Sequence, residues 1–153
     1  MKAAARYRFD KESHTTGALA NGTYTIAGQP AREFTATDGG LFLLEEDQEL
    51  YLYFGASFNI QNDDQDLRIS LTFKIPRSIP VGAFHPFPKG PYRIESEIFD
   101  ANDGHPYQVA AKGNLNCRYR TDHTVGAVAN CTFQESEGYP DIELHVANIE
   151  ARG

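Results

Sequence analysis

The sequence predicts an all-β protein, built as a two-layer antiparallel β-sandwich of about ten strands. Three observations lead to this prediction. Many short segments alternate apolar and polar residues, turn residues separate these segments at short intervals, and no segment shows a convincing helical period. A closed β-barrel made from the same strands is the alternative. The length of 153 residues is typical of one folding unit, so we predict a single domain over residues 1–153.

The clearest strand covers residues 67–75, where five apolar residues alternate with four polar ones. Successive side chains of a strand point to opposite faces, so this pattern predicts one buried face and one face in water. The segment contains no glycine and ends at Pro76, which favours a central strand. The residues predicted to face the core are Leu67, Ile69, Leu71, Phe73 and Ile75.

Further strands are predicted on both sides of this segment. The shorter candidates cover residues 6–9, 23–27, 33–37, 41–44, 50–54 and 58–60, and clear alternation marks residues 92–98, 107–119, 127–133 and 142–146. Within residues 107–119 the odd-numbered apolar residues, including Cys117 and Tyr119, are predicted to share the inner face. Turns rich in Gly, Asp, Asn and Glu are predicted at residues 27–30, 38–40, 45–48, 62–66, 100–104 and 135–140.

A proline-rich segment at residues 75–91 interrupts the alternation with five prolines. Proline cannot donate a backbone hydrogen bond, so this segment is predicted to follow a sheet edge or the surface. Its end is a candidate recognition loop, because a stiff aromatic loop loses little entropy on binding. The alternative is that its two phenylalanines fold back and cap one end of the sandwich. The candidate binding residues are Phe84, His85, Phe87, Lys89 and Tyr92.

A set of spaced motifs runs through the second half of the chain. The strand at residues 67–75 is followed by Val81-Gly82-Ala83-Phe84, by Gly113-Asn114-Leu115, by a segment from Gly126 to Phe133, and by a last strand at residues 142–149. In this order the chain resembles, over about residues 67–150, small bacterial β-sandwich domains of unknown function that are often found in lipoproteins. The chain lacks their lipobox and adds the proline-rich segment. The resemblance implies a sandwich without established catalytic residues.

The two cysteines are the most specific pair in the sequence. Cys117 and Cys131 have the same inward parity on successive strands, and a hairpin centred on Thr124 would place them directly opposite each other. That arrangement predicts a contact that is either a disulfide or a pair of buried thiols. Two cysteines without neighbouring histidines do not complete a tetrahedral metal site, so no metal is predicted here.

Two acidic clusters are weak calcium candidates. Calcium prefers six to eight oxygen ligands on flexible loops, and neither cluster has the twelve-residue frame of an EF-hand. Asp, Asn and Gly are also the usual residues of turns, so we interpret both clusters as turns and predict no cofactor. The candidate residues are Asp63, Asp64 and Asp66 in one cluster and Asp100, Asn102 and Asp103 in the other.

The sequence contains no catalytic signature. The histidines fall in predicted loops, except for His145 on the polar side of a strand, and Glu95 and Glu97 share a predicted wet strand face. No Gly-x-Ser-x-Gly elbow and no tryptophan are present. We therefore predict a non-enzymatic binding or protein-interaction module. A small-ligand-binding sandwich or barrel is the alternative, and a hydrolase is the least favoured class.

Charge and hydropathy restrict the partners. The net charge of −7 and the isoelectric point near 5.1 disfavour nucleic acid, whose phosphates an acidic surface repels. A protein or a small ligand is the expected partner. No segment approaches the roughly 20 apolar residues of a membrane-spanning helix. The first residues lack the apolar core of a secretory signal, which predicts the cytoplasm by default and an extracytoplasmic site if a signal has been removed.

Overall fold

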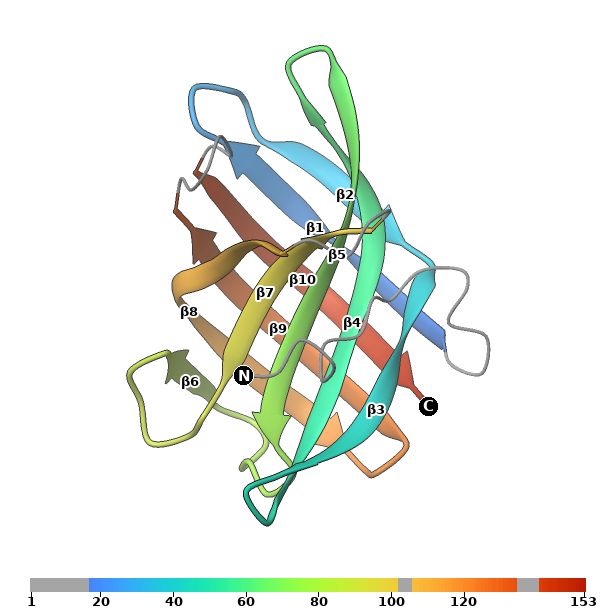
Figure 1. Cartoon of the computed structure of the whole chain (residues 1–153), viewed down its shortest axis with the longest axis vertical. Coiled ribbons are helices and arrows are strands. Elements are labelled where there is room, and N and C mark those ends of the chain that lie inside the picture. Colours follow the sequence, from blue (N-terminus) through green and yellow to red (C-terminus); the bar gives the residue numbers. More distant parts are fainter. Residues whose placement is uncertain (1–16, 102–105, 135–140) are drawn as a thin grey trace.

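A computed structural model describes residues 17–101, 106–134 and 141–153, and these ranges contain ten strands and no helix. The predicted all-β fold is therefore confirmed, and its layers are visible in Figure 1. The predicted strand at residues 6–9 lies outside the described ranges. The strands are β1 (Gly17–Ile26), β2 (Arg32–Ala36), β3 (Asp38–Glu46), β4 (Glu49–Asn62), β5 (Gln65–Pro76), β6 (Phe84–Phe87), β7 (Glu95–Asp100), β8 (Pro106–Arg120), β9 (Thr124–Phe133) and β10 (Ile142–Arg152).

The strands form two antiparallel sheets. One has six strands in the order β2-β1-β10-β9-β8-β6, and the other has four in the order β3-β4-β5-β7. Strand β8 joins them, because its first residues pair with β7 while the rest pairs with β9 and β6. The end strands β2 and β3 are not paired with each other in the described residues, so the path is not a closed barrel. In Figure 1 the four-stranded sheet crosses in front of the six-stranded one.

The core lies between the inner faces of the two sheets. A single cluster of buried apolar residues includes side chains from both, and Phe34 of β2 stacks on Phe58 of β4 with ring centroids 4.1 Å apart. Burial of apolar surface on this scale is the main stabilising contribution to such a fold. Strand β5 lies between β4 and β7, as the alternation at residues 67–75 predicts. Ile69, Leu71, Phe73 and Ile75 are buried in the core, and Leu67 packs partly against it.

The opposite face of β5 does not face water, which corrects the prediction for this strand. Ser70, Thr72 and Lys74 are exposed by only 0%, 2% and 4%, respectively. Their burial is tolerated because each is hydrogen-bonded: Ser70 shares a 2.6 Å contact with Ser57, and Thr72 donates to the Glu97 carbonyl over 3.3 Å. The four-stranded sheet is thus buried on both faces along β5.

Residues 38–40 were predicted as a turn but form the start of β3. Gly39 permits this, because a Cβ at that position would lie 2.3 Å from the Gly55 carbonyl oxygen and 2.7 Å from the Ala18 Cβ. Glycine here allows two backbones to approach closely rather than to reverse direction. The predicted strands at residues 50–54 and 58–60 are likewise one strand, β4, which Gly55 and Ala56 do not interrupt.

The predicted inner position of Tyr119 is also wrong. The pairing of β8 with β9 shifts between Cys117 and Tyr119, as at a β-bulge, and this shift ends the regular alternation. Tyr119 is 40% exposed and donates a 3.0 Å hydrogen bond to Glu150. The turn between β8 and β9 spans residues 121–123, where Thr121 accepts hydrogen bonds from the backbone amides of His123 and Thr124.

Candidate functional site

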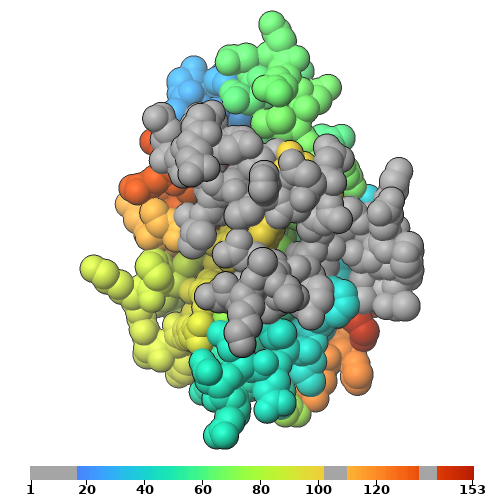
Figure 2. Space-filling model, viewed as in Figure 1, coloured from blue at the N-terminus to red at the C-terminus, as the bar shows by residue number. Residues whose placement is uncertain are grey.

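The predicted recognition loop projects from the side of the molecule and belongs to the edge of the six-stranded sheet. Its central part is the short strand β6, which pairs with β8 alone among the described residues. Most residues between 77 and 91 are exposed, and Figure 2 shows this yellow-green segment standing out from the body of the protein. The proline-rich segment therefore follows an edge, as its composition predicts. We refer to residues 80–92 below as the strap.

The two phenylalanines of the strap have opposite environments. Phe87 is buried and lies against Gly113, where an added Cβ would come within 2.5 Å of its ring. Phe84 is 51% exposed, and Val81, three residues earlier, is 50% exposed. The folded-back interpretation is therefore right for Phe87 and wrong for Phe84. Phe87 fixes the strap to the sheet, which leaves Phe84 presented to solvent.

The other three candidate residues have two roles: His85 and Tyr92 make contacts within the strap, and Lys89 contributes a positive charge. The rings of His85 and Tyr92 meet edge to face, with centroids 4.8 Å apart, and the His85 Nε2 atom lies 3.2 Å from the Pro80 carbonyl oxygen. These two contacts link the beginning, middle and end of the strap. Lys89 is exposed and has no ion-pair partner among the described residues. The structure thus separates the five predicted binding residues, which are close in sequence, into the exposed Phe84 and Lys89, the buried Phe87, and the paired rings of His85 and Tyr92.

The two cysteines do not face each other, so the predicted contact is wrong. The register pairs Cys117 with Ala127 and Cys131 with Gly113, because the connecting turn is centred before Thr124. Both cysteines are free and buried, which agrees with the interpretation as separate thiols. Burial raises the pKa of the Cys117 thiol to about 11 and that of the Cys131 thiol to about 12. Thiols that stay protonated at neutral pH are poor nucleophiles.

The acidic clusters have different positions in the structure. Asp63 and Asp64 form the two-residue turn between β4 and β5, with a positive φ of 54° at Asp63, and Asp66 lies in β5. Asp100 ends β7, whereas Asn102 and Asp103 lie outside the described residues. The described residues contain no group of three or more His, Cys, Asp or Glu side chains arranged to hold a metal ion.

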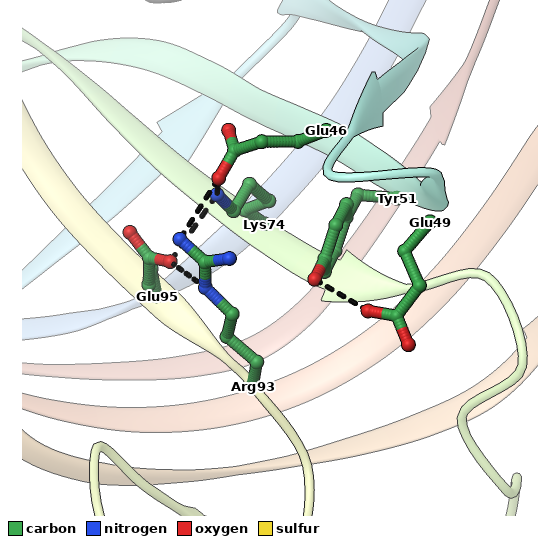
Figure 3. Close-up of polar contacts among 6 residues, drawn as sticks. All are labelled: Glu46, Glu49, Tyr51, Lys74, Arg93 and Glu95. Carbon is green, nitrogen blue, oxygen red and sulfur yellow. Dashed lines mark hydrogen bonds and ion pairs between the residues drawn. The ribbon is translucent and has the colours of Figure 1, made fainter. Parts of the chain in front are cut away.

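A cluster of charged residues on the outer face of the four-stranded sheet was missed from the sequence. Figure 3 shows Lys74 of β5 between Glu46 of β3 and Glu95 of β7, with Nζ 3.1 Å and 3.2 Å from their carboxylate oxygens. Arg93 binds the same two carboxylates, at 2.8 Å and 2.9 Å. The Lys74 ammonium also lies 4.9 Å from the ring centre of Tyr51. The alternation had assigned Lys74, Arg93 and Glu95 to wet strand faces, and Glu46 was predicted in a turn, so no local signal marked the cluster.

The pKa values of the ionisable groups in this cluster are shifted further from pH 7. The hydrogen bond from Lys74 lowers the pKa of the Glu46 carboxyl despite desolvation, and the hydrogen bond to Glu49 together with burial raises the pKa of Tyr51. Burial opposes the charge of Arg93, but hydrogen bonds to Glu95 and Tyr51 raise its pKa. A general acid or base needs a pKa near the working pH. The cluster is therefore suited to holding three strands together rather than to proton transfer.

Hollows also lie elsewhere on the surface, and one of them, of about 310 Å³, is lined by polar residues that include Asp38, Asn59 and Arg68. A second, of about 430 Å³, lies beside the start of β1 and the end of β10, and it contains the exposed side chains of Leu19 and Tyr119 together with Glu150 and Arg152. A third, of about 540 Å³, is lined by Glu49, Arg77 and Arg120 and lies next to the charged cluster. Lys74 does not line any of these hollows.

In the described ranges there is no helix long and apolar enough to cross a bilayer. Comparison with known proteins found no matching family model, no matching curated protein and no matching solved structure.

Proposed function

We propose that this protein is a non-enzymatic interaction module that binds a protein partner through the strap. The observation that supports this proposal most directly is the exposure of Phe84, 51%, on a segment that the buried Phe87 fixes to the sheet. A large apolar side chain held in solvent on a stiff support loses little conformational entropy when it enters a partner's pocket. Exposed aromatic anchors of this kind provide much of the binding energy at protein interfaces.

Two further features support a binding role over a catalytic one. The ionisable cluster around Lys74 has pKa shifts that stabilise its ordinary charge states, which is the opposite of what acid–base catalysis requires. The resemblance of residues 67–150 to small bacterial β-sandwich domains also implies no catalytic residues. The resemblance suggests a β-sandwich fold, and we propose that this sandwich serves binding.

Site-specific crosslinking tests the proposal. A photoreactive residue is placed at position 84 in one protein and at position 43 in another, because Leu43 is 45% exposed on β3 and lies outside the strap. We expect a discrete adduct in source-cell extract from position 84 alone. The captured protein is then purified, and Phe84→Ser should weaken its binding about tenfold while Leu43→Ser changes it less than twofold. Equal adducts from both positions, or no effect of Phe84→Ser, would reject the proposal.

A second candidate function is the binding of a small apolar ligand in the hollow beside Leu19. It is favoured by the 58% exposure of Leu19 and the 40% exposure of Tyr119 on the same hollow. A ligand that binds only the folded protein raises its melting temperature. A thermal-shift screen of small apolar acids and amines, repeated on Leu19→Ser, tests it. Ligands whose effect persists in that variant would exclude this hollow.

A further inference from the structure

Basic and acidic residues are distributed unequally in this acidic chain. Residues 76–94 and 104–134 together contain six of the 14 basic residues but only one of the 21 acidic residues, Asp122. Asp122 lies in the turn between β8 and β9 and is paired with Arg77 at 2.8 Å. These two segments form the strap and strands β6, β8 and β9, which are neighbours in the six-stranded sheet. The fold therefore brings two segments that are poor in acidic residues together.

The register of β6 and β8 shows which side chains share the outer face. Phe84 pairs with Asn116 and Pro86 pairs with Asn114, whereas Leu115 and Phe87 are buried on the inner face. Strand β9 continues the same outer rows, because Val128 pairs with Asn116 and Asn130 pairs with Asn114. We call this outer surface the acid-free face. Its residues are Phe84, Pro86, Lys112, Asn114, Asn116, Arg118, Val128, Asn130 and Thr132.

Phe84 lies between two exposed cations on this face. Lys112 and Arg118 are six residues apart on β8, which corresponds to roughly 20 Å at 3.3 Å per residue. Neither forms an ion pair with a described residue, and Arg118 contacts only the neutral amide of Asn148, at 3.2 Å. Lys89, just beyond β6, adds a third unpaired cation on the side of Lys112. A ligand that runs along β8 on this face therefore meets positive charge at both ends and an aromatic ring in between, while Glu143 and Glu150 of β10 border the face beyond β9.

We propose that the acid-free face binds an extended acidic peptide segment that carries an apolar side chain between its carboxylates. This inference rests on the proposed function and names the chemical class of the partner. The apolar side chain would contact Phe84, and the carboxylates would pair with Lys112 and Lys89 at one end and with Arg118 at the other. A segment of about six extended residues spans that distance.

Two observations favour a peptide over a nucleic acid. The Oδ1 atom of Asn116, next to Phe84, is buried and accepts no hydrogen bond from any described residue. An extended peptide backbone presents N–H donors at regular intervals, and one of them would satisfy this atom when Phe84 shifts. A nucleic acid presents phosphate acceptors along its backbone and has donors only on its bases and sugars. The protein's net charge of −7 also repels a ligand in proportion to the ligand's own charge. A peptide with a few carboxylates is repelled less than a polymer with a charge on every nucleotide.

A second copy of the chain fits this face less well. The exposed acidic turn between β3 and β4 lies close to Leu43, which is 45% exposed, but two of its carboxylates already have partners within the chain. Glu46 pairs with Lys74 and Arg93, and Glu49 accepts a hydrogen bond from Tyr51. The turn between β4 and β5, which contains Asp63 and Asp64, is flanked by the polar residues Asn62 and Gln65 and offers no apolar side chain for Phe84.

Fluorescence anisotropy on the full chain tests the inference. The probe is a labelled decapeptide with a central leucine pair flanked by glutamates, and we expect a dissociation constant of about 10–100 μM in low salt. Replacing the glutamates by glutamines should abolish binding, and replacing the leucines by serines should weaken it about fivefold. Raising the salt concentration to about 0.5 M should also weaken it, because salt screens exposed charges.

Matched protein variants locate the binding. The double variant Lys112→Glu with Arg118→Glu should weaken binding at least about tenfold, and Phe84→Ser about fivefold. Arg32→Glu, an exposed cation on β2 of the same sheet, should change it less than twofold. All four residues are at the surface, so the circular dichroism and the melting temperature of each variant should match those of the parent protein. An equal effect of Arg32→Glu would overturn the inference.

Four other outcomes also overturn the inference, and each can be distinguished from the rest. Tighter binding of a single-stranded oligonucleotide than of the peptide would indicate a nucleic-acid site. A dimer in light scattering that Phe84→Ser abolishes would indicate self-association. No peptide binding together with a persistent crosslink from position 84 would reject the acidic class of partner and leave the interaction module standing, whereas loss of both would reject the proposed function itself.

Discussion

The outer faces of the two sheets have similar alternating sequences but different environments. Along β10 the residues from Ile142 to Val146 alternate strictly between buried and exposed. Along β5 every residue from Ile69 to Pro76 is buried, whichever way its side chain points. Alternation therefore identifies both strands and their inner faces correctly. It does not report whether the polar side is in water.

The polar residues on the two outer faces differ in their partners. On the six-stranded sheet, His145 and Asn130 form a 2.6 Å contact at the surface, and Lys112 is exposed without an ion pair among the described residues. On the four-stranded sheet, Lys74 has two carboxylates and Ser70 has the Ser57 hydroxyl. Burying a polar group without a hydrogen-bonding partner costs several kcal/mol. The polar side chains of β5 are therefore tolerated in a buried position because each one has a partner.

The largest test of this comparison replaces one lysine on each sheet by methionine. Lys74→Met removes a buried cation from Glu46 and Glu95, and we expect it to lower the free energy of unfolding by about 2 kcal/mol. The loss stays below that of a fully unpaired buried charge because Arg93 remains bound to both carboxylates. Lys112→Met on β8 should change stability by less than about 0.5 kcal/mol. Denaturant unfolding measures both, and equal losses would show that Lys74 is not held by this network.

A smaller loss of stability is expected when Thr72, on the buried outer face of β5, is replaced by alanine. The sequence alone places Thr72 on a wet face and predicts a cost under about 1 kcal/mol for Thr72→Ala. In the structure its hydroxyl is buried and donates to the Glu97 carbonyl, so we expect a loss of about 1–2 kcal/mol. Thr35→Ala, at an exposed site on β2, should stay within about 0.5 kcal/mol. Chemical denaturation of the two variants would contradict the buried assignment if Thr72→Ala were no worse than Thr35→Ala.

The smallest expected effect is a change in how stability depends on pH in the variant Glu46→Gln. The pKa of Glu46 is lowered in the folded protein, chiefly by the hydrogen bond from Lys74. Its carboxylate therefore stabilises the fold above the unfolded-state pKa of about 4.3, and this contribution disappears as the pH falls through the lower folded-state value. Glu46→Gln should reduce the loss of stability between about pH 5 and pH 3 by at most about 1 kcal/mol. Glu143→Gln removes the same charge from the exposed side of β10 and serves as the matched control. An equal effect of the two substitutions would contradict the role of the Lys74 hydrogen bond.

At the candidate site, too, some features could be predicted from the local sequence and others depend on residues that are distant in the sequence. The proline content of the strap is a local signal, and it correctly places the segment on an edge. Which phenylalanine is buried is not a local property, because it depends on Gly113 leaving space for Phe87. The cysteine prediction failed for a related reason. Parity placed both thiols inside correctly, but the position of the turn at residues 121–123 shifted the pairing.

The local sequence pattern was enough to predict the all-β class, the inner faces of β5 and β10 and the edge position of the proline-rich strap. These features follow from a two-residue side-chain period and from the hydrogen bond that proline lacks, which are both local properties of the chain. Only the tertiary structure decided the burial of Lys74, the separation of the two thiols and the gathering of basic residues around Phe84. Those depend on which strands become neighbours and in which register, and each register is selected by packing between residues distant in sequence.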